Sequence, residues 1–464
     1  MKFSFYNTLT RQKEELKPLK PKKIDIFVCG PTVYDLAHIG HGRVFVIFDA
    51  VVKTLRHSGY NVRYLQNITD VDDKIIARAE LQGKTPKALA HKFEHEYLKD
   101  MKALNITSPD NYARASDHID EILSQIKRLL KKDCAYITPN GVYFSVKNFH
   151  DYGKLSHQKL DKMEETERIE HDPDKKHKQD FALWKKAKAG EPFWPSPWGK
   201  GRPGWHIEDT AIAEKYFGQQ YDMHGGALDL IFPHHECEIA QMETISNKKP
   251  YVRMWLHAGF LNVRGEKMSK SLGNIISIRD LLKDYSAQAF RMLIFQAHYR
   301  SPIDYDEDLM KQAQAAQERL TDFYNRLKTI KRFGPENDRI KSIIFTSNKN
   351  FWEKLEDDFN TPRAIAIIFS LMKTLNPLIN NFAISKREAK AAKEFLKNAD
   401  GIMHILGPKQ TSSIPQEVKN LINERELMRK ERRWTEADQS RKELAQIGWT
   451  IEDTPEGPKP KRIE

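Results

Sequence analysis

A strand, a helix and a second strand follow one another near the start of the chain. Residues 24–29 form a β-branched apolar run that stops at Gly30-Pro31, as a buried strand does. Residues 40–57 carry apolar side chains at helical spacing, and residues 62–66 again have strand character. Two strands joined through a helix are parallel neighbours in one sheet. The sequence therefore predicts an α/β domain built on a parallel sheet.

The α/β pattern is interrupted once and later gives way to helices. Asn140-Gly141, the strongest short hairpin signal, lies between two apolar strand-like runs. Residues 161–180 have very few apolar side chains, which is typical of a solvated loop, and we interpret this region as an insertion. From about residue 305 to 405, apolar side chains recur every three or four positions, which predicts a helical bundle. A basic segment follows Gly407-Pro408.

Composition excludes several classes of protein. No apolar run approaches the ~20 residues needed to span a bilayer. The first residues lack the long apolar stretch that a secretory signal has. The three cysteines, Cys29, Cys134 and Cys237, are too few for a disulfide framework and indicate a reducing compartment. We therefore expect a cytoplasmic protein that does not bind membranes. The net charge of +12 suits a polyanionic partner such as nucleic acid.

Two short motifs are typical of phosphate binding. Residues 38–41 read His-Ile-Gly-His and lie between the first strand and the first helix, where helix N–H groups attract phosphates. Residues 267–271 read Lys-Met-Ser-Lys-Ser, so two lysines three positions apart can meet one triphosphate. In this order, on opposite sides of an insertion, the pair resembles the HIGH and KMSKS signatures of class I aminoacyl-tRNA synthetases. Such a resemblance implies ATP with Mg²⁺ as a substrate.

The resemblance also implies roles for the residues of these two motifs. Phosphoryl transfer needs positioned groups that neutralise charge on the phosphate oxygens, and the attacking carboxylate needs no general base. The catalytic residues implied are His38, His41, Lys267 and Lys270. The ATP-binding residues implied are Thr32, His38, Gly40, His41, Lys267, Ser269 and Lys270.

A third group of residues has the character of a metal site. His234 and Glu238 are four positions apart, so on a helix they share one face and offer half of a zinc site. Cys29 adds a thiolate at the end of the first strand. The stretches around residues 29–35, 67–74, 204–208 and 232–236 resemble the cysteinyl-tRNA synthetase family, and the resemblance runs over nearly the whole chain.

That family resemblance implies one zinc ion per chain, held by two cysteines, one histidine and one glutamate. The thiolate of the substrate, L-cysteine, completes the shell. This chain departs from the pattern, because Asp209 stands where the family has its second cysteine. We expect the ligands Cys29, Asp209, His234 and Glu238; Cys237 replacing Asp209, and a weakened or absent zinc, are the alternatives.

The resemblance further implies a substrate pocket and a tRNA-reading end. Trp205 would wall the pocket and Asp229 would pair with the substrate ammonium group. An aromatic ring can stack on an unpaired base while neighbouring arginines bind phosphates. The residues expected to contact the cysteine tRNA are Arg432, Arg433, Trp434 and Asp438.

The implied architecture is a Rossmann-type parallel-sheet catalytic domain with an insertion, a helical bundle and a small C-terminal anticodon-binding domain, in a monomer. The expected boundaries are 1–117 and 204–250 for the catalytic halves, 118–203 for the connective insertion, 251–308 for a stem-contact region with the KMSKS loop, 309–405 for the bundle and 406–464 for the anticodon-binding domain. The expected activity is the charging of tRNA with cysteine. An ATP-dependent cysteine:amine ligase and a non-catalytic tRNA-binding paralogue are the alternatives.

Overall fold

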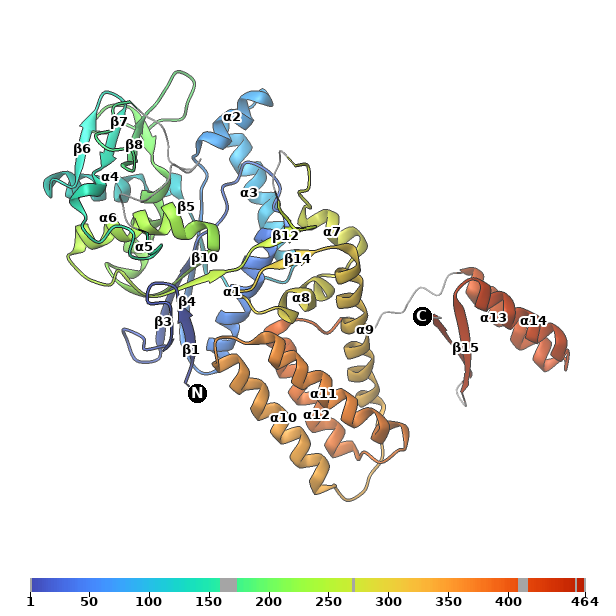
Figure 1. Ribbon diagram of the computed structural model, residues 1–464. Coiled ribbons are helices and arrows are strands. Elements are labelled where there is room, and N and C mark those ends of the chain that lie inside the picture. The colour runs from blue at the N-terminus through green and yellow to red at the C-terminus, as the bar shows by residue number, and fades with distance from the viewer. Residues whose placement is uncertain (1, 159–172, 269–271, 408–415, 455–456, 463–464) are drawn as a thin grey trace. The chain divides into compact units, whose positions relative to one another are not determined.

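A computed structural model describes residues 2–158, 173–268, 272–407, 416–454 and 457–462 (Figure 1). The chain divides into two units, Met1–Leu406 and Gly407–Glu464. None of the described helices is long and apolar enough to cross a lipid bilayer.

A five-stranded parallel sheet organises the first unit. Its strand order is β11-β10-β3-β4-β5, and every neighbouring pair is parallel. The strands are β3 (Lys23–Val28), β4 (Asn61–Ile68), β5 (Asn111–Arg114), β10 (Tyr221–Ala227) and β11 (Val252–Ala258). The predicted strand–helix–strand unit is β3, α1 (Ile39–His57) and β4. The expected α/β class is confirmed, and β11 carries the sheet past residue 250.

Alternating side chains of β3 face two different cores. Ile26 and Val28 belong to one apolar cluster, which also contains the buried side chains of α1. Phe27 and Cys29 belong to the other, with side chains of α5 (Trp205–Phe217) and α6 (Glu236–Ser246). Because successive strand residues point to opposite faces, Cys29 is placed on the face that α5 and α6 cover.

A separate four-stranded antiparallel sheet lies in the region read as an insertion. Its strands are β6 (Ala135–Thr138), β7 (Gly141–Phe144), β8 (Phe181–Lys186) and β9 (Gly201–Pro203), preceded by α4 (Ile119–Lys131). Residues 152–156 of the insertion contact α6 directly. The Tyr152 hydroxyl lies 3.3 Å from the Cys237 sulfur, and the Ser156 N–H donates to Glu236 at 2.8 Å. This segment therefore anchors the insertion on α6.

Helices dominate the rest of the first unit, and two helices with a hairpin form the second. The remaining elements are α2 (Asp73–Leu81), α3 (Pro86–Ala103), α7 (Ile278–Asp284), α8 (Ala287–Gln296), α9 (Glu307–Thr329), α10 (Asp338–Glu356), α11 (Thr361–Asn380), α12 (Lys386–Met403), α13 (Gln416–Lys430) and α14 (Trp434–Gln446). The shorter strands are β1 (Ser4–Asn7), β2 (Gln12–Glu15), β12 (Leu261–Val263), β13 (Glu266–Lys267), β14 (Ile303–Tyr305), β15 (Trp449–Thr454) and β16 (Gly457–Arg462). Helices α9 to α12 form the predicted bundle, as Figure 1 shows.

A buried ion pair joins α1 to the helices that follow the sheet. Arg291 of α8 donates to Asp49 of α1 at 3.0 Å, and neither side chain is exposed to solvent. The same guanidinium donates to the carbonyl of Met403, at the end of α12, at 2.6 Å. The Arg291 side chain thus connects α1 to the end of α12 in the bundle.

We predict that Asp49→Asn lowers the free energy of unfolding by about 3–5 kcal/mol, because the Arg291 guanidinium would stay buried without its partner. Urea denaturation followed by circular dichroism measures the change. The control is Glu307→Gln in the exposed pair Glu307–Lys311, which should cost less than about 1 kcal/mol. An equal, small cost for both variants would contradict the role given to the buried pair.

Candidate active site and metal centre

A cleft of about 730 Å³ opens beside the carboxyl end of β3. Its walls come from the loop after β3, the start of α1, the insertion and the segment that leads into the Lys-Met-Ser-Lys-Ser motif. Parallel α/β sheets bind ligands at this edge, outside the carboxyl ends of the strands. Residues of the expected site that line the cleft are Cys29, Thr32, His38, Gly40, His41, Trp205, Asp229 and Lys267.

The two histidines of the first motif cap helix α1. The His38 ring accepts a hydrogen bond from Gly40 N–H at Nδ1 (3.1 Å), and the His41 ring accepts one from His38 N–H at Nδ1 (3.3 Å). A neutral ring whose Nδ1 accepts carries its proton on Nε2. The rings stack with centroids 3.8 Å apart. Each ring therefore keeps one Nε2–H donor for a ligand.

Burial keeps both of these imidazoles neutral. It lowers the pKa of His38 to about 4, against a smaller opposing effect of Asp229. Burial also holds the pKa of His41 well below its ordinary value, and the neighbouring His38 adds to that effect. At neutral pH these side chains can therefore offer hydrogen bonds to phosphate oxygens but no positive charge.

Lys267 places a positively charged ammonium group at the cleft. Its ammonium nitrogen lies 3.4 Å from Asp229 Oδ2 and 4.9 Å from the centre of the Phe260 ring. Gly40 leaves room beside this segment, because a Cβ there would lie 2.9 Å from the Met268 side chain. Ser269 and Lys270 lie outside the described residues. The structure thus brings one lysine of the second motif to the cleft.

Cys29, Asp209, His234 and Glu238 come together behind the cleft wall, with one ligand atom of each within 4.8 Å of the others. Cys29 Sγ lies 3.0 Å from Asp209 Oδ2, which lies 3.1 Å from His234 Nε2. His234 Nε2 is 3.3 Å from Glu238 Oε1, and all four residues are buried. One thiolate, one imidazole and two carboxylates at these separations fit a tetrahedral dication. We call these four residues the first seat.

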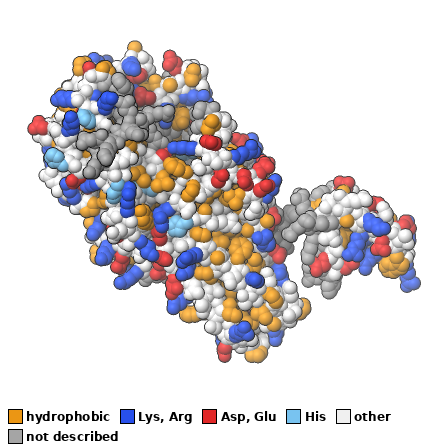
Figure 2. Space-filling view, viewed as in Figure 1, with side chains coloured by type: hydrophobic (Ala, Val, Ile, Leu, Met, Phe, Trp, Pro, Cys, Tyr) orange, Lys and Arg blue, Asp and Glu red, His pale blue; other side chains and the backbone are white. Residues whose placement is uncertain are grey.

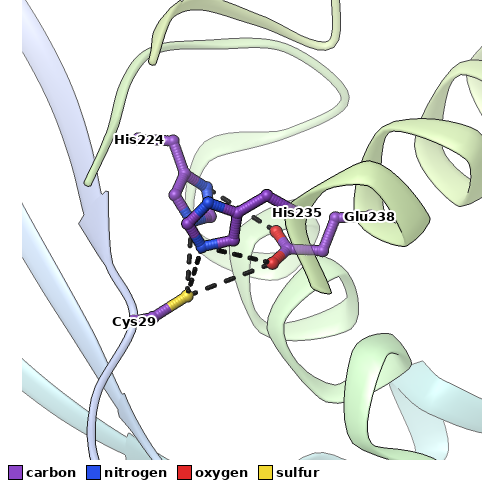
Figure 3. A group of neighbouring side chains, drawn as sticks. All are labelled: Cys29, His224, His235 and Glu238. Carbon is purple, nitrogen blue, oxygen red and sulfur yellow. Dashed lines mark hydrogen bonds and ion pairs between the residues drawn. The ribbon is translucent and has the colours of Figure 1, made fainter. Parts of the chain in front are cut away.

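Two further histidines, which the sequence analysis missed, approach the same sulfur from another side (Figure 3). His224 Nε2 lies 3.4 Å and His235 Nε2 lies 3.1 Å from Cys29 Sγ. With Cys29 and Glu238 they form a second four-residue group, all buried. The sequence offered one signal for His235, its position three residues before Glu238, which places both on one helix face. It offered none for His224, which is distant in sequence from the other ligands.

Both neighbouring histidines approach the site because they lie four and three positions before Glu238. Residues 231–235 form a π-helical turn that is kinked at Phe232, with φ −133° and ψ 135°. Helix α6 begins only after the second histidine, at Glu236. His224 reaches the site separately, from β10.

Cys237 lies outside both groups among the described residues. Its sulfur faces the Tyr152 hydroxyl of the insertion at 3.3 Å. On helix α6 it is one position from Glu238, and so points to a different side. The arrangement therefore favours Asp209 over Cys237 as the fourth residue of the first seat.

Neighbouring side chains fix the orientation of each of these groups. Asn67 donates to Asp209 Oδ1 at 2.6 Å, which leaves Oδ2 toward Cys29. Nδ1 of His234 lies 2.8 Å from His206, and Nδ1 of His235 lies 2.8 Å from His257. Such contacts on the far side of a ring set which nitrogen faces a metal.

Burial favours the uncharged forms of four side chains in this cluster: Cys29, His224, His235 and Glu238. It raises the pKa of the Cys29 thiol well above its ordinary value, and the nearby Asp209 and Glu238 carboxylates raise it further. Burial, and then Asp209, raises the pKa of Glu238 in the same way. The pKa of His224 and of His235 is held well below the ordinary value, chiefly by burial. A bound dication would displace the thiol and carboxyl protons, since these groups ligate metals in their ionised forms.

Trp205 and Asp229, the two expected substrate residues, both line the cleft. The Trp205 ring stacks on His234, with centroids 4.2 Å apart and an interplanar angle of 20°. It therefore stands between the cleft and a residue of the first seat.

The expected tRNA residues lie together at the start of α14 in the second unit. Trp434 is 59% exposed. Arg433 is engaged with Glu431 and Glu436, while Arg432 and Asp438 are exposed. Lys and Arg side chains are scattered over the visible faces of both units (Figure 2).

Comparison with known families covers most of the chain. Residues 15–315 match the catalytic domain of class I tRNA synthetases (C), residues 350–407 match the DALR domain, and residues 411–458 match the anticodon-binding domain of cysteinyl-tRNA ligase. A cysteine–tRNA ligase of Thermococcus gammatolerans is 44% identical over 479 residues and covers 100% of both chains. One of Coxiella burnetii strain RSA 493 is 44% identical over 98% of this chain and 99% of its own.

Solved structures of similar fold are more distant in sequence. Mycobacterium tuberculosis methionyl-tRNA synthetase in complex with methionyl-adenylate has a TM-score of 0.60 and 14% identity, over 84% of this chain and 93% of its own. A LeuRS of Agrobacterium radiobacter K84, in a complex with tRNA and LeuAMS, has a TM-score of 0.62 and 12% identity, over 84% and 85%. These likenesses show a shared fold.

The low pKa of His38 gives a testable dependence of stability on pH. An unfolded histidine takes up a proton near pH 6.5, whereas folded His38 does so only near 4. Folding therefore gains stability from keeping the His38 ring neutral: this gain is fully present above pH 6.5 and is lost as the pH falls toward 4. Asparagine keeps an acceptor at the helix cap but does not titrate.

We predict that wild type loses about 3 kcal/mol of unfolding free energy relative to His38→Asn between pH 7 and pH 4. Urea denaturation of both proteins at a series of pH values measures the difference. A difference that stays constant over this range would show that folded His38 titrates normally.

Proposed function

The chain belongs to the cysteinyl-tRNA synthetase family, and from that premise we propose which residues carry each step of its reaction. The enzyme joins cysteine to tRNA at the expense of ATP. In the first step the cysteine carboxylate attacks the α-phosphate of ATP, which gives cysteinyl-adenylate and pyrophosphate. In the second step the acyl group passes to the 3′ end of the cysteine tRNA.

The cleft residues position ATP for the first step. His38 and His41 each present a neutral Nε2–H to the phosphates. Lys267 and Lys270 neutralise charge on the departing pyrophosphate, with Mg²⁺ bound to ATP, and Ser269 of the same motif binds ATP through its hydroxyl. Thr32 and Gly40 line the nucleotide side. The Lys267–Asp229 contact of 3.4 Å would open as ATP binds, and Asp229 is assigned to the substrate ammonium.

Recognition of cysteine is assigned to a metal ion in the first seat. The observation that supports it is the meeting of Cys29 with Asp209, His234 and Glu238 behind the cleft wall. When bound there, a zinc ion supplies a thiophilic Lewis acid that favours an ionised thiol over the hydroxyl of serine. Apolar contacts alone would separate such near-isosteres by only ~1–3 kcal/mol. Trp205, stacked on His234, walls the pocket beside this centre.

Asp209 makes this centre harder than the two-cysteine pattern of the family. Cys29 is its single protein sulfur, while two carboxylates supply oxygen. Formal charge is unchanged by the exchange of a thiolate for a carboxylate. One zinc per chain, a monomeric state and a cytoplasmic location remain predictions.

The two alternatives raised by the sequence have less support. A cysteine:amine ligase would lack the C-terminal end, whereas residues 411–458 match an anticodon-binding domain. A non-catalytic paralogue would not need the neutral, capped histidines that line the cleft. The second unit is accordingly assigned to the anticodon, with Trp434 as the stacking side chain and Arg432, Arg433 and Asp438 around it.

We predict that Cys29→Ser loses its metal and that cysteine-dependent pyrophosphate exchange falls by more than about 100-fold. Residues that merely orient a metal ligand already contribute about 10–100-fold. Metal analysis by mass spectrometry and exchange assays with cysteine and serine measure the effects. The control is Cys134→Ser, in the insertion, which should keep both metal and activity. A Cys29→Ser enzyme that keeps its metal and still rejects serine would refute the assignment.

We predict that Trp434→Ala weakens tRNA binding about ten- to a hundredfold, because loss of one stacked base costs ~1–3 kcal/mol. Exchange of pyrophosphate without tRNA should be unchanged. The control is Leu427→Ala, another exposed apolar side chain of the same unit. Filter binding measures the tRNA affinity. Equal affinity for Trp434→Ala and wild type would show that Trp434 does not contribute to tRNA binding.

A further inference from the structure

We propose that His224 and His235, with Cys29 and Glu238, form a second seat for the metal ion, which holds the ion when Asp209 cannot. The proposal rests on the metal centre proposed above and deepens it. The two seats share the Cys29 sulfur and the Glu238 carboxylate, and each adds two residues of its own.

The positions of the donor atoms carry the proposal. In the second seat, Cys29 Sγ lies 3.4 Å from His224, 3.1 Å from His235 and 4.0 Å from Glu238 Oε1. Ligands of a tetrahedral zinc with bonds of about 2.0–2.3 Å lie about 3.3–3.8 Å apart. Glu238 Oε1 also lies 4.0 Å from His235 Nε2, slightly beyond that range. The sulfur and the two imidazoles of the second seat are therefore in place, and the Glu238 carboxylate would have to move toward them.

The imidazoles of the second seat are already oriented. His224 Nδ1 lies 2.6 Å from the Tyr221 hydroxyl, and His235 Nδ1 lies 2.8 Å from His257. His257 lies in turn 2.8 Å from the Thr8 hydroxyl. With Nδ1 engaged, each ring directs Nε2 to the Cys29 sulfur. Histidines that ligate metals are held in this way, through the nitrogen that does not bind the ion.

Glu238 supplies a second, independent observation. Its Oε2 atom is buried and has no hydrogen-bond partner within the described part of the chain. That atom lies 3.6 Å from Nδ1 of His224. The other oxygen, Oε1, lies 3.3 Å from His234 Nε2 and 4.0 Å from both Cys29 Sγ and His235 Nε2, so it faces donor atoms of both seats. A buried carboxylate oxygen without a hydrogen-bond partner is destabilising, and a cation bound by Glu238 would relieve it.

The donor chemistry suits zinc to the second seat when the first is incomplete. The first seat offers one sulfur, one nitrogen and two oxygens. The second seat offers one sulfur, two nitrogens and one oxygen. Zinc is a borderline-soft ion that favours sulfur and imidazole nitrogen. His224 and His235 can therefore hold zinc with Cys29 and Glu238 when the Asp209 carboxylate is removed.

The decisive experiment measures metal content in full-length variants purified with zinc. We expect wild type, Asp209→Ala and His235→Ala each to keep about one zinc per chain. The double variant Asp209→Ala/His235→Ala should keep less than about a tenth, since neither seat is then complete. Zinc X-ray absorption on Asp209→Ala should show one sulfur and two imidazoles. Asp209→Asn, which preserves shape, replaces Asp209→Ala if circular dichroism shows that the latter is unfolded.

Two results would overturn the proposal. One is loss of zinc from folded Asp209→Ala or Asp209→Asn while wild type retains it. The other is retention with only one imidazole at the ion. Cys29→Ser separates this proposal from the one on which it rests, because it removes a ligand from both seats. A wild-type protein without bound metal, or a Cys29→Ser protein that keeps it, would defeat the metal centre itself.

Discussion

Burial of many polar side chains around a single sulfur atom is the constraint on which the active site depends. Cys29 follows the central strand of the parallel sheet, on the face covered by α5 and α6. Two carboxylates and three imidazoles lie within the same cluster. Groups of this kind are costly to bury as ions, so burial raises the pKa of Cys29 and Glu238 and lowers the pKa of His224 and His235. These four side chains therefore favour their uncharged forms until a dication binds.

The two binding functions of the cleft use opposite electrostatic strategies. The nucleotide side relies on neutral imidazoles whose tautomers are fixed by the cap of α1, with positive charge delivered separately by lysine. Donors held in place before the reaction stabilise developing charge without reorganising. The amino-acid side relies on acidic ligands that need a cation. Both sides meet at the loop after β3, which joins Cys29 to the capped helix within ten residues.

Sequence predicted the parts of the molecule that follow from periodicity and spacing. The strand–helix–strand unit, the hairpin at Asn140-Gly141 and the helices after residue 305 all reflect regular burial patterns. The spacing of His234 and Glu238 was also readable, and Cys237, one position from Glu238, points to a different side as helical spacing requires. His235 was missed although it lies three positions before Glu238, a spacing that places both residues on one face. His224 was missed because it reaches the site from β10, a neighbouring strand of the sheet that is distant in sequence.

The contacts between residues 152–156 and α6 join two parts of the enzyme that are far apart in the sequence. Ser156 and Leu155 donate backbone hydrogen bonds to Glu236, and Tyr152 touches Cys237, one position before Glu238. Rigid helices transmit displacement along their length. Because these contacts reach the first turn of α6, a shift of the insertion would act on the backbone that carries Glu238.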